Sequence, residues 1–335
     1  MGTAGPYSNE EIMETTNSIN SLQATELLHK QLSCWSLATQ NYQALAHCEV
    51  RTFQMEEGCT IKVQFNPARI ISSNAKVDNR SLATRRCFLC PDHLPSEQLR
   101  INWKDRYLLL TNPFPIFREH FTLPSCQHEP QSIASKINDL LELTQQLKQF
   151  TLFYNGPKCG ASAPDHAHFQ AATRHVMPLD NESDQIHQHR TSIIEMSDGT
   201  LQSFTHYLRN GFIIKARTRK TASELFRQIY DALEIHPDEY EPRMNLFSSY
   251  SDEEGWTLQI IPRRQHRPWQ YAATGEEQLI SSPGAADVGG LFITARPEDF
   301  QKINAALLRD IFQQVCLRDE EIDAIAERIR HKKHP

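Results

Sequence analysis

The sequence has no run of about 18 apolar residues, so it offers no candidate for a membrane-spanning helix. Its N-terminal segment 1–10 is polar and lacks the apolar core of a secretion signal, and Pro6 stands where a myristoylation signal after Gly2 needs Ser or Thr. The eight cysteines are too few and too scattered for the disulfide framework of a small secreted protein. These absences predict a cytoplasmic protein with no membrane partner.

The sequence also lacks a strong excess of charge of either sign. Its 35 Lys and Arg residues and 41 Asp and Glu residues are mixed along the chain and leave a net charge of −6. This balance argues against nucleic acid as a partner, so an anionic ligand would have to be held by local groups. With 335 residues, of which 39% are hydrophobic, the chain has the composition of a globular protein with one large or two medium domains.

The hydrophobic pattern predicts an α+β protein, with helical and strand periods alternating along the chain. Helices are predicted over 21–47 (with a broken end and a packing role only), 130–149, 222–233, 298–316 and 319–330. Strands are predicted over 60–65, 106–111, 150–154, 243–247 and 256–261, with others near 120–123, 193 and 212–215. The order strand, helix, strand, turn, strand occurs twice, which indicates a degenerate duplication. The predicted segments are a helical extension 1–58, a first unit 59–190, a second unit 191–297 and C-terminal helices 298–335.

The stretch from Asn155 to Gln170 is the centre of the first unit. It opens with turn-forming and small residues, whose backbone N–H groups can face an anion, and closes with His166, His168 and Gln170 at every second position. On a strand these three side chains share one face, which predicts a ligand site. The alternative is a buried strand whose histidines only find hydrogen-bond partners.

Cys87 and Cys90 form the only local cysteine pair, and two residues between them is the spacing of a metal-binding knuckle. The alternatives are a redox dithiol and two unrelated buried thiols, although the loop-rich surroundings do not resemble a thioredoxin unit. A tetrahedral metal needs two further ligands, for which we choose His128 and His166. The competing ligands are Cys126 and His93. Zn²⁺ accepts such a Cys₂His₂ set.

Several other positions have both a functional and an ordinary interpretation. Asn112 and Phe114, in a turn fixed by two prolines, either frame a pocket or only form the turn. Arg69, in a turn leading to a strand over 66–73, either reaches an anion or is a surface charge. The polar stretch 180–191 is predicted to be a loop or lid, with its two histidines at the surface.

A cationic patch and a small-residue loop follow the last predicted strand of the second unit. The patch consists of Arg263, Arg264, His266 and Arg267, and it is either a solvated loop or a site for a second phosphate-bearing substrate. The loop 281–290 either lets backbone approach a ligand or is a tight connection.

These motifs together resemble the nucleotidyltransferase branch of the histidine-triad superfamily, which includes galactose-1-phosphate uridylyltransferase, diadenosine tetraphosphate phosphorylase and the GDP-hexose phosphorylases. The resemblance rests on Cys87-x₂-Cys90, Asn112-Pro-Phe-Pro, His128 and Asn155-x₄-Gly160-x-Ser162-x₃-His166-x-His168-x-Gln170, within about residues 60–175. It implies two histidine-triad-like half-units with antiparallel sheets and flanking helices, the second degenerate.

The resemblance also implies roles for individual residues. His168 would be the nucleophile, Gln170 and Ser162 would contact the reacting phosphate, and Asn112 and Asn155 would line the nucleotide site. A zinc site would consist of Cys87, Cys90, His128 and His166.

The residues support such chemistry on their own. A neutral imidazole that attacks an α-phosphorus forms a nucleotidyl-histidine, provided that its Nδ1–H has a fixed acceptor, for which a carbonyl of the adjoining strand is the natural candidate. The phosphoryl charge would be held by the backbone N–H groups of Gly160, Ala161 and Ser162, with Lys158 as a point charge. Gln170 donates a hydrogen bond but cannot protonate a leaving group, which favours transfer between phosphates.

The predicted function is therefore that of a nucleotidyltransferase or phosphorylase, acting on an NDP-sugar or dinucleoside polyphosphate with a phosphate-bearing acceptor. The alternatives are a non-catalytic nucleotide- or sugar-phosphate-binding protein and a hydrolase on the same fold. The strand 256–262 has no histidine where the uridylyltransferases have metal-binding ones, and Ile260-Ile-Pro-Arg263 looks more like the phosphorylases. Because the related transferases are often dimers, a homodimer is one option.

Overall fold

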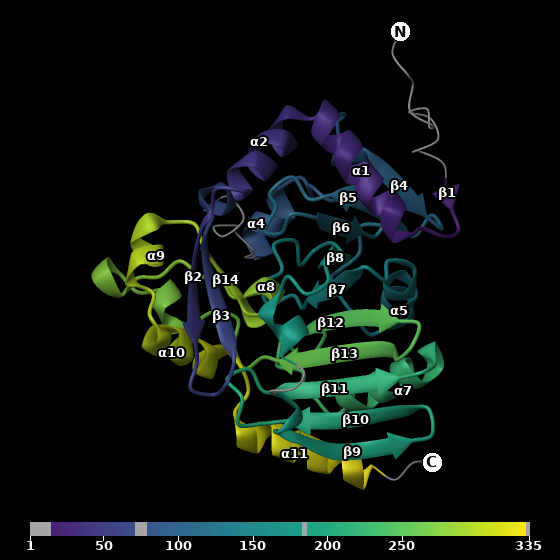
Figure 1. The fold of residues 1–335 in the computed structure, drawn as a ribbon, viewed down its shortest axis with the longest axis vertical. Helices are drawn as coiled ribbons and strands as arrows, with labels where there is room; N and C mark the ends of the chain where they lie inside the picture. Colours follow the sequence, from purple (N-terminus) through teal and green to yellow (C-terminus); the bar gives the residue numbers. More distant parts are fainter. Residues whose placement is uncertain (1–14, 71–78, 183–185, 333–335) are drawn as a thin grey trace.

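A computed structural model describes residues 15–70, 79–182 and 186–332. Its main feature is an 11-stranded sheet with the order β1-β4-β5-β6-β8-β7-β12-β13-β11-β10-β9 (Figure 1). The bounds in that order are Thr15–Thr16, Arg100–Trp103, Tyr107–Thr111, His120–Pro124, His168–Thr173, Phe150–Asn155, Met244–Ser251, Gly255–Pro262, Gly211–Ala216, Gly199–Phe204 and Arg190–Met196. All neighbouring pairs are antiparallel except β1 with β4. The predicted α+β fold with antiparallel strands is thus confirmed.

Most strands of the two predicted units belong to this one sheet, and β3 and β14 are the exceptions. The two units meet where β7 pairs with β12, with Asn155 opposite Asn245 and Phe153 opposite Phe247. A second sheet of three strands has the order β14-β3-β2, with bounds Leu291–Thr294, Thr60–Phe65 and Glu49–Gln54. Here β14, from near the C-terminal end, runs parallel to β3, from near the N-terminal end. The division of the chain into four segments remains a prediction.

The helices fall on both faces of the large sheet. The α-helices are α1 (Ser21–Cys34), α2 (Ser36–Leu45), α4 (Asn79–Thr84), α5 (Ile137–Gln146), α7 (Arg219–Tyr230), α8 (Ala285–Val288), α9 (Pro297–Lys302), α10 (Ala305–Val315) and α11 (Asp319–His331). Short 3₁₀ turns occur at Pro67–Arg69, Pro91–His93, Pro178–Asn181, Trp269–Tyr271 and Gly275–Glu277. Among the described residues, no helix combines the length and the apolar character needed to cross a bilayer.

Alternation along the central strands separates two hydrophobic cores. Leu152 and Tyr154 of β7 point to the core that contains residues of α1, α5, α7 and α11, whereas Phe153 points to the core that contains β3, β14 and α10. On β8, Phe169 belongs to the first core, and the even-numbered His168 and Gln170 lie on the opposite face. The candidate site residues of β8 therefore face the side of the small sheet.

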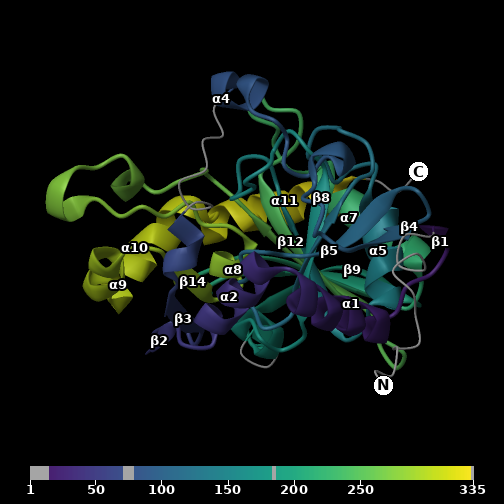
Figure 2. The same cartoon turned by 90° about the horizontal axis from the view of Figure 1, so that it is seen from above.

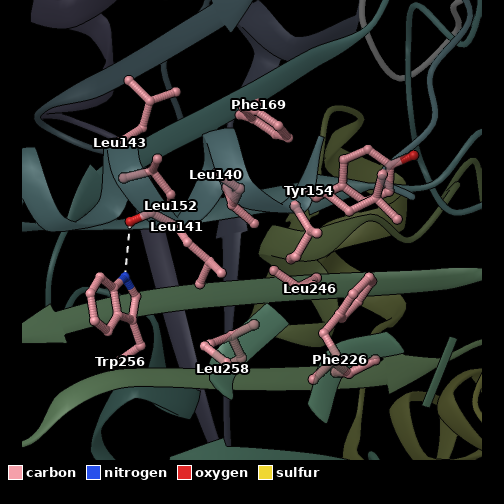
Figure 3. Packing of buried hydrophobic residues seen from close by; sticks show 14 of the residues in the cluster. Leu140, Leu141, Leu143, Leu152, Tyr154, Phe169, Phe226, Leu246, Trp256 and Leu258 are labelled. Carbon is pink, nitrogen blue, oxygen red and sulfur yellow. Dashed lines mark hydrogen bonds between the residues drawn. The ribbon is translucent and has the colours of Figure 1, made fainter. Parts of the chain in front are cut away.

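The first core is filled by side chains from facing elements (Figure 3). Leu140 and Leu141 of α5 pack over Leu152 and Leu246, and all four are fully buried. The indole N–H of Trp256 donates a hydrogen bond to the carbonyl of Leu141, with an N···O distance of 2.9 Å. This bond satisfies a buried polar group and ties β13 to α5.

Several predicted elements have different bounds in the structure. The helix predicted over 21–47 is broken at Trp35 into α1 and α2, and α5 is shorter than the predicted 130–149. The helix predicted over 298–316 is two helices, because Asn304 starts a new one by accepting a hydrogen bond from the N–H of Leu307. Strand β10 was not predicted.

Parts of two predicted segments lie outside the described residues. They are residues 71–73 of the predicted turn and strand 66–73, and residues 183–185 of the predicted loop or lid 180–191. The described part of the lid segment is anchored rather than free. Glu182 is buried, accepts a hydrogen bond from the backbone N–H of Thr60 and pairs with the fully buried Arg209. His187 is exposed, as predicted, and His189 is half-buried.

Replacing Leu152 with Ala should lower the free energy of unfolding by about 2–5 kcal/mol, because the cavity left between α5 and the sheet cannot close. Leu22→Ala is the matched control, since the Leu22 side chain is 66% exposed and its loss should change stability by less than about 0.5 kcal/mol. Urea unfolding of both variants measures the difference. Equal effects would contradict the assignment of the first core.

Candidate active site and metal centre

A cavity of about 590 Å³ lies on the face of the large sheet that carries His168 and Gln170. Its volume is in the range typical of small-molecule sites. Its walls come from the corner between α1 and α2, the turn between β5 and β6, strand β8, the loop after β7 and the loop before α8. Residues from both predicted units therefore enclose one space.

The cavity brings together most of the residues predicted for a substrate site. The predicted residues that line it are Asn112, Asn155, Gly160, Ala161, Ser162, His168 and Gln170. Lys158 does not line the cavity. Arg69, for which a surface charge was one interpretation, does line it, and one of its Nη atoms donates to the carbonyl of Phe114 at 2.7 Å.

The His168 imidazole has a defined tautomer. Its Nδ1 lies 2.8 Å from the carbonyl oxygen of His166, which can only accept a hydrogen bond, so Nδ1 carries the proton and Nε2 has a free lone pair. Burial lowers the pKa of His168 to about 4, so the ring is neutral at pH 7. We had expected the acceptor to lie on the adjoining strand. It lies instead two residues earlier in the same segment.

The backbone of His168 is held by Gln131, a fully buried residue that the sequence reasoning did not single out. The pairing of β7 with β8 ends at Phe153 and Gln170, so His168 lies beyond the last pair. There the Gln131 side chain acts as a strand partner. Its Oε1 accepts from the His168 N–H at 2.7 Å, and its Nε2 donates to the carbonyls of His168 and Asn155 at 3.0 and 2.9 Å. No local pattern marks this residue, because its role depends on two distant strand ends.

Gln170 is oriented by the buried His120. The Nδ1 of His120 accepts a hydrogen bond from the backbone N–H of Ile116 at 3.2 Å, so the ring proton is on Nε2. That Nε2 donates to Oε1 of Gln170 at 2.8 Å. Burial lowers the pKa of His120 to about 3, which keeps this tautomer neutral. The amide nitrogen of Gln170 is thereby left to donate into the cavity.

Asn155 is oriented in the same way by the second unit. Its Oδ1 accepts from the backbone N–H of Ala285 at 2.6 Å and from the amide of Asn245 at 2.8 Å. The guanidinium of Arg263 fixes the Asn245 amide by donating to its Oδ1 at 2.7 Å. The Asn155 side chain therefore has its oxygen occupied and its nitrogen as the free donor.

Asn112 lines the cavity, but both ends of its amide are used within the turn. Its Oδ1 accepts from the N–H of Phe114 at 3.0 Å, and its Nδ2 donates to the hydroxyl of Thr122 at 3.0 Å. This geometry is that of a turn-stabilising asparagine.

The loop after β7 presents unpaired backbone donors. The N–H groups of Gly160, Ala161 and Ser162 donate no hydrogen bond to any residue that the structure describes. Gly160 has a φ of 88°, and a Cβ there would lie 2.3 Å from Cα of Gly284. Only glycine permits this contact, which closes the loop against the segment before α8. Such free N–H groups in a turn can bind an anion.

The electrostatics of the cavity also favour an anion. Three arginines line it, Arg69, Arg85 and Arg267, against one carboxylate, Asp287. Arg85 pairs with Asp165 at 2.6 Å, whereas Arg69 and Arg267 pair with no carboxylate among the described residues.

The opposite part of the lining is apolar, and part of it comes from the N-terminal helices. Trp35, at the break between α1 and α2, and Leu37 line the cavity together with Phe88 and Pro95. The segment 21–47, for which a packing role was predicted, therefore also contributes two side chains to the cavity wall. The break turns these side chains toward the cavity, which a helical period does not reveal.

The four predicted metal ligands lie together beside this cavity. The ligand atoms of Cys87, Cys90, His128 and His166 are all within 4.8 Å of one another. The Sγ atom of Cys87 is 3.3 Å from Nδ1 of His166, and that of Cys90 is 3.2 Å from Nδ1 of His128. Tetrahedral zinc with its usual bond lengths separates S and N ligands by about 3.5 Å, so the donor set fits zinc.

The surroundings support this ligand set over its competitors. The Nε2 of His166 lies 2.8 Å from the carbonyl of Ser125, which orients the ring as the outer partner of a metal ligand does. Nδ1 of His93 instead lies 2.9 Å from the carbonyl of Cys87, and neither His93 nor Cys126 belongs to the cluster. His166 precedes β8, so it does not share a strand face with His168 as predicted, and it turns to the cysteines instead.

The fold of this chain is similar to that of yeast Ap4A phosphorylase Apa2, and the resemblance predicted from the sequence is confirmed at the level of fold. Yeast Ap4A phosphorylase Apa2 in complex with Ap4A matches with a TM-score of 0.53 and 15% sequence identity, over 90% of this chain and 99% of the other. The same enzyme in complex with AMP matches with a TM-score of 0.51 and 15% identity, over 87% and 95%.

Sequence comparison adds one match. The family model described as a domain of unknown function (DUF4922) matches residues 27–173, which include the whole predicted site except the second-unit loops. No curated protein matches the chain in sequence.

Replacing Cys90 with Ser should abolish zinc binding, because one of the four ligands becomes a poor one. We expect about one zinc ion per wild-type chain by elemental analysis, and a lowered melting temperature after chelation. Cys126→Ser is the matched control and should keep its zinc. Unchanged zinc in Cys90→Ser, or loss in Cys126→Ser alone, would show that the ligand set is wrong.

Replacing Gly160 with Ala should destabilise the protein more than the same change at Gly58. Both glycines have positive φ, but a Cβ at Gly58 meets nothing within 4 Å. Gly58→Ala should therefore cost only the strain of about 1–2 kcal/mol, and Gly160→Ala should exceed it by about 1–3 kcal/mol because the Gly284 backbone must shift. Urea unfolding tests the order, and similar costs would refute the close packing.

Proposed function

We propose that the protein is a nucleotidyltransferase that acts on an NDP-sugar or dinucleoside polyphosphate through a covalent nucleotidyl-His168 intermediate, with a phosphate-bearing acceptor. The observation that carries the proposal is the His168 imidazole, which is neutral, held by its Nδ1–H and placed on the wall of a cavity. A neutral imidazole with a free Nε2 lone pair is a nucleophile for phosphorus.

In the first step, Nε2 of His168 attacks the α-phosphorus of the donor. The N–P bond forms as the P–O bond to the leaving phosphate breaks, and the bonding electrons leave with that oxygen. The positive charge that develops on the ring is stabilised at Nδ1–H by the carbonyl of His166. The leaving group is already a stable phosphate anion, so no proton donor is required.

In the second step, a phosphate oxygen of the acceptor attacks the same phosphorus and the N–P bond breaks. Inorganic phosphate as acceptor makes the reaction a phosphorolysis. The charge on the transferred group is balanced by the amide of Gln170 and by the free N–H groups of the loop from Gly160 to Ser162, which are in place before the substrate binds.

The fold comparison supports this class of substrate. Three structures of an Ap4A phosphorylase, one of them with bound Ap4A, match this chain with TM-scores above 0.5. Diadenosine polyphosphates are therefore the first donors to test.

The bound metal that we propose is Zn²⁺, held by Cys87, Cys90, His128 and His166. A closed four-ligand site of this kind stabilises structure. Here it would join the loop after α4 to the segment that carries the carbonyl acceptor of His168. The cytoplasmic location and the homodimer remain predictions.

Incubation with GDP-, UDP- and ADP-sugars and with diadenosine polyphosphates, followed by intact-mass analysis, tests the proposal. We expect an acid-labile nucleotidyl adduct on the wild type, because a phosphorus–nitrogen bond to imidazole hydrolyses in acid, and no adduct on His168→Ala. His187→Ala, which removes an exposed imidazole, should form the adduct as the wild type does. Nucleotide binding without an adduct would support a binding protein, and turnover in His168→Ala would exclude the mechanism.

A further inference from the structure

The cationic patch predicted from the sequence is not a single surface in the structure. Arg263 is buried and orients Asn245, and Arg264 pairs with Glu321 of α11. Arg267 is the member of the patch that lines the cavity. It belongs to the loop between β13 and α8, which Figure 2 shows extending away from the large sheet beside α9 and α10.

The Arg267 guanidinium is held at one side and free at the other. Its Nε donates to the hydroxyl of Ser282 at 3.1 Å, and its Cζ lies 3.9 Å from the ring centroid of Tyr271. The Ser282 hydroxyl is also 3.1 Å from Nε2 of His266. Neither Nη atom has a hydrogen-bond partner, and no carboxylate lies within ion-pair distance, among the residues that the structure describes. A guanidinium fixed in this way presents a two-pronged donor to an anion.

Arg267 lines the same cavity as the loop that would hold the transferred phosphate. Ser281, Ser282 and Gly284 line the same cavity, and Gly284 is in direct contact with Gly160. The Arg267 side chain therefore enters the cavity from the side where the free N–H groups of the loop 160–162 lie.

Further positive charge surrounds this corner. Burial and the positive charges of Arg267, Arg263 and Lys158 lower the pKa of His266 to about 3, so this imidazole, which lies 3.1 Å from the Ser282 hydroxyl, is neutral at pH 7. Arg267 itself has no carboxylate partner among the described residues, and an unpaired cation in a cavity favours an anion.

We propose that Arg267, held by Ser282, forms a second phosphate subsite for the phosphate that is not transferred. In the first step this is the terminal phosphate of the leaving group, and in the second step it is the phosphate of the acceptor. The inference rests on the proposed function and assigns its acceptor side to a loop of the second unit. The ligand class is a phosphate monoester or inorganic phosphate in its dianionic form.

Titration calorimetry with inorganic pyrophosphate tests the subsite directly. Pyrophosphate can place one phosphate at the loop 160–162 and the other at Arg267. We expect binding about ten-fold weaker or worse in Arg267→Ala, with partial recovery in Arg267→Lys, which keeps the charge but not the fork. Arg264→Ala removes a neighbouring arginine that pairs with Glu321, and it should bind pyrophosphate within about two-fold of the wild type.

A second measurement separates the two phosphates kinetically. In Arg267→Ala, formation of the nucleotidyl adduct at saturating donor should persist, whereas the phosphate concentration needed for half-maximal discharge of the adduct should rise about ten-fold. Circular dichroism melting of each variant confirms that it is folded.

Each outcome decides one of the two ideas. Unchanged pyrophosphate binding in Arg267→Ala overturns the subsite, because Arg267 then does not contact the anion. Equal weakening in Arg264→Ala also overturns it, because the loss of affinity then reflects only the general positive charge of the region. If the wild type forms no adduct but its pyrophosphate binding depends on Arg267, the proposed reaction fails and the anion subsite stands.

Discussion

The hydrogen bond from Nδ1–H of His168 to the carbonyl of His166 is the contact on which the candidate site depends. Without it the neutral ring could carry its proton on either nitrogen, and Nε2 would not be a defined nucleophile. The bond joins two residues whose side chains have different tasks. The His166 side chain turns to the two cysteines, and its main-chain carbonyl accepts the hydrogen bond from His168. Because both are fixed by the same short segment, the geometry of the cysteine–histidine cluster and the orientation of the His168 ring are coupled through the backbone.

A second theme is the use of amides whose oxygen is already occupied. The side-chain oxygen of Gln170 accepts a hydrogen bond from His120. That of Asn155 accepts hydrogen bonds from the backbone N–H of Ala285 and the amide of Asn245. In each case the protein removes the acceptor and leaves the donor, so the cavity offers hydrogen to an anion and little that would repel it. Burial keeps His120 neutral, which avoids adding a charge that its pocket cannot solvate.

The second predicted unit has no histidine on the strand β13, but its residues complete the candidate site of the first. Its strand β12 pairs with β7, its Arg263 orients Asn155 through Asn245, and its loop before α8 closes against Gly160. A cavity shared in this way needs both units to be folded and joined. The continuous sheet supplies that connection, since strands in one hydrogen-bonded ladder cannot move independently.

Much of the fold and part of the site could be predicted from local pattern alone. The alternation in Thr60–Phe65 predicted β3, and the spacings Cys87-x₂-Cys90 and His166-x-His168 marked candidate metal ligands and a candidate nucleophile, because these features depend on residues close together in the sequence. The resemblance predicted the fold, and the similarity to the fold of yeast Ap4A phosphorylase agrees with that prediction.

The tertiary structure alone decided the rest. His168 lines the cavity, whereas His166 precedes β8 and turns to the cysteines. The Gln131 side chain forms the hydrogen bonds to His168 that a neighbouring strand would otherwise form. Trp35 and Arg267, which are far apart in the sequence, line the same cavity. Gln131 and Trp35 had no local signal, and Arg267 was marked only as one member of a cationic patch, since the place of each depends on a contact between segments that are far apart in sequence. Periodicity predicts which way a residue faces on its own element, but only the packing of elements determines what it faces.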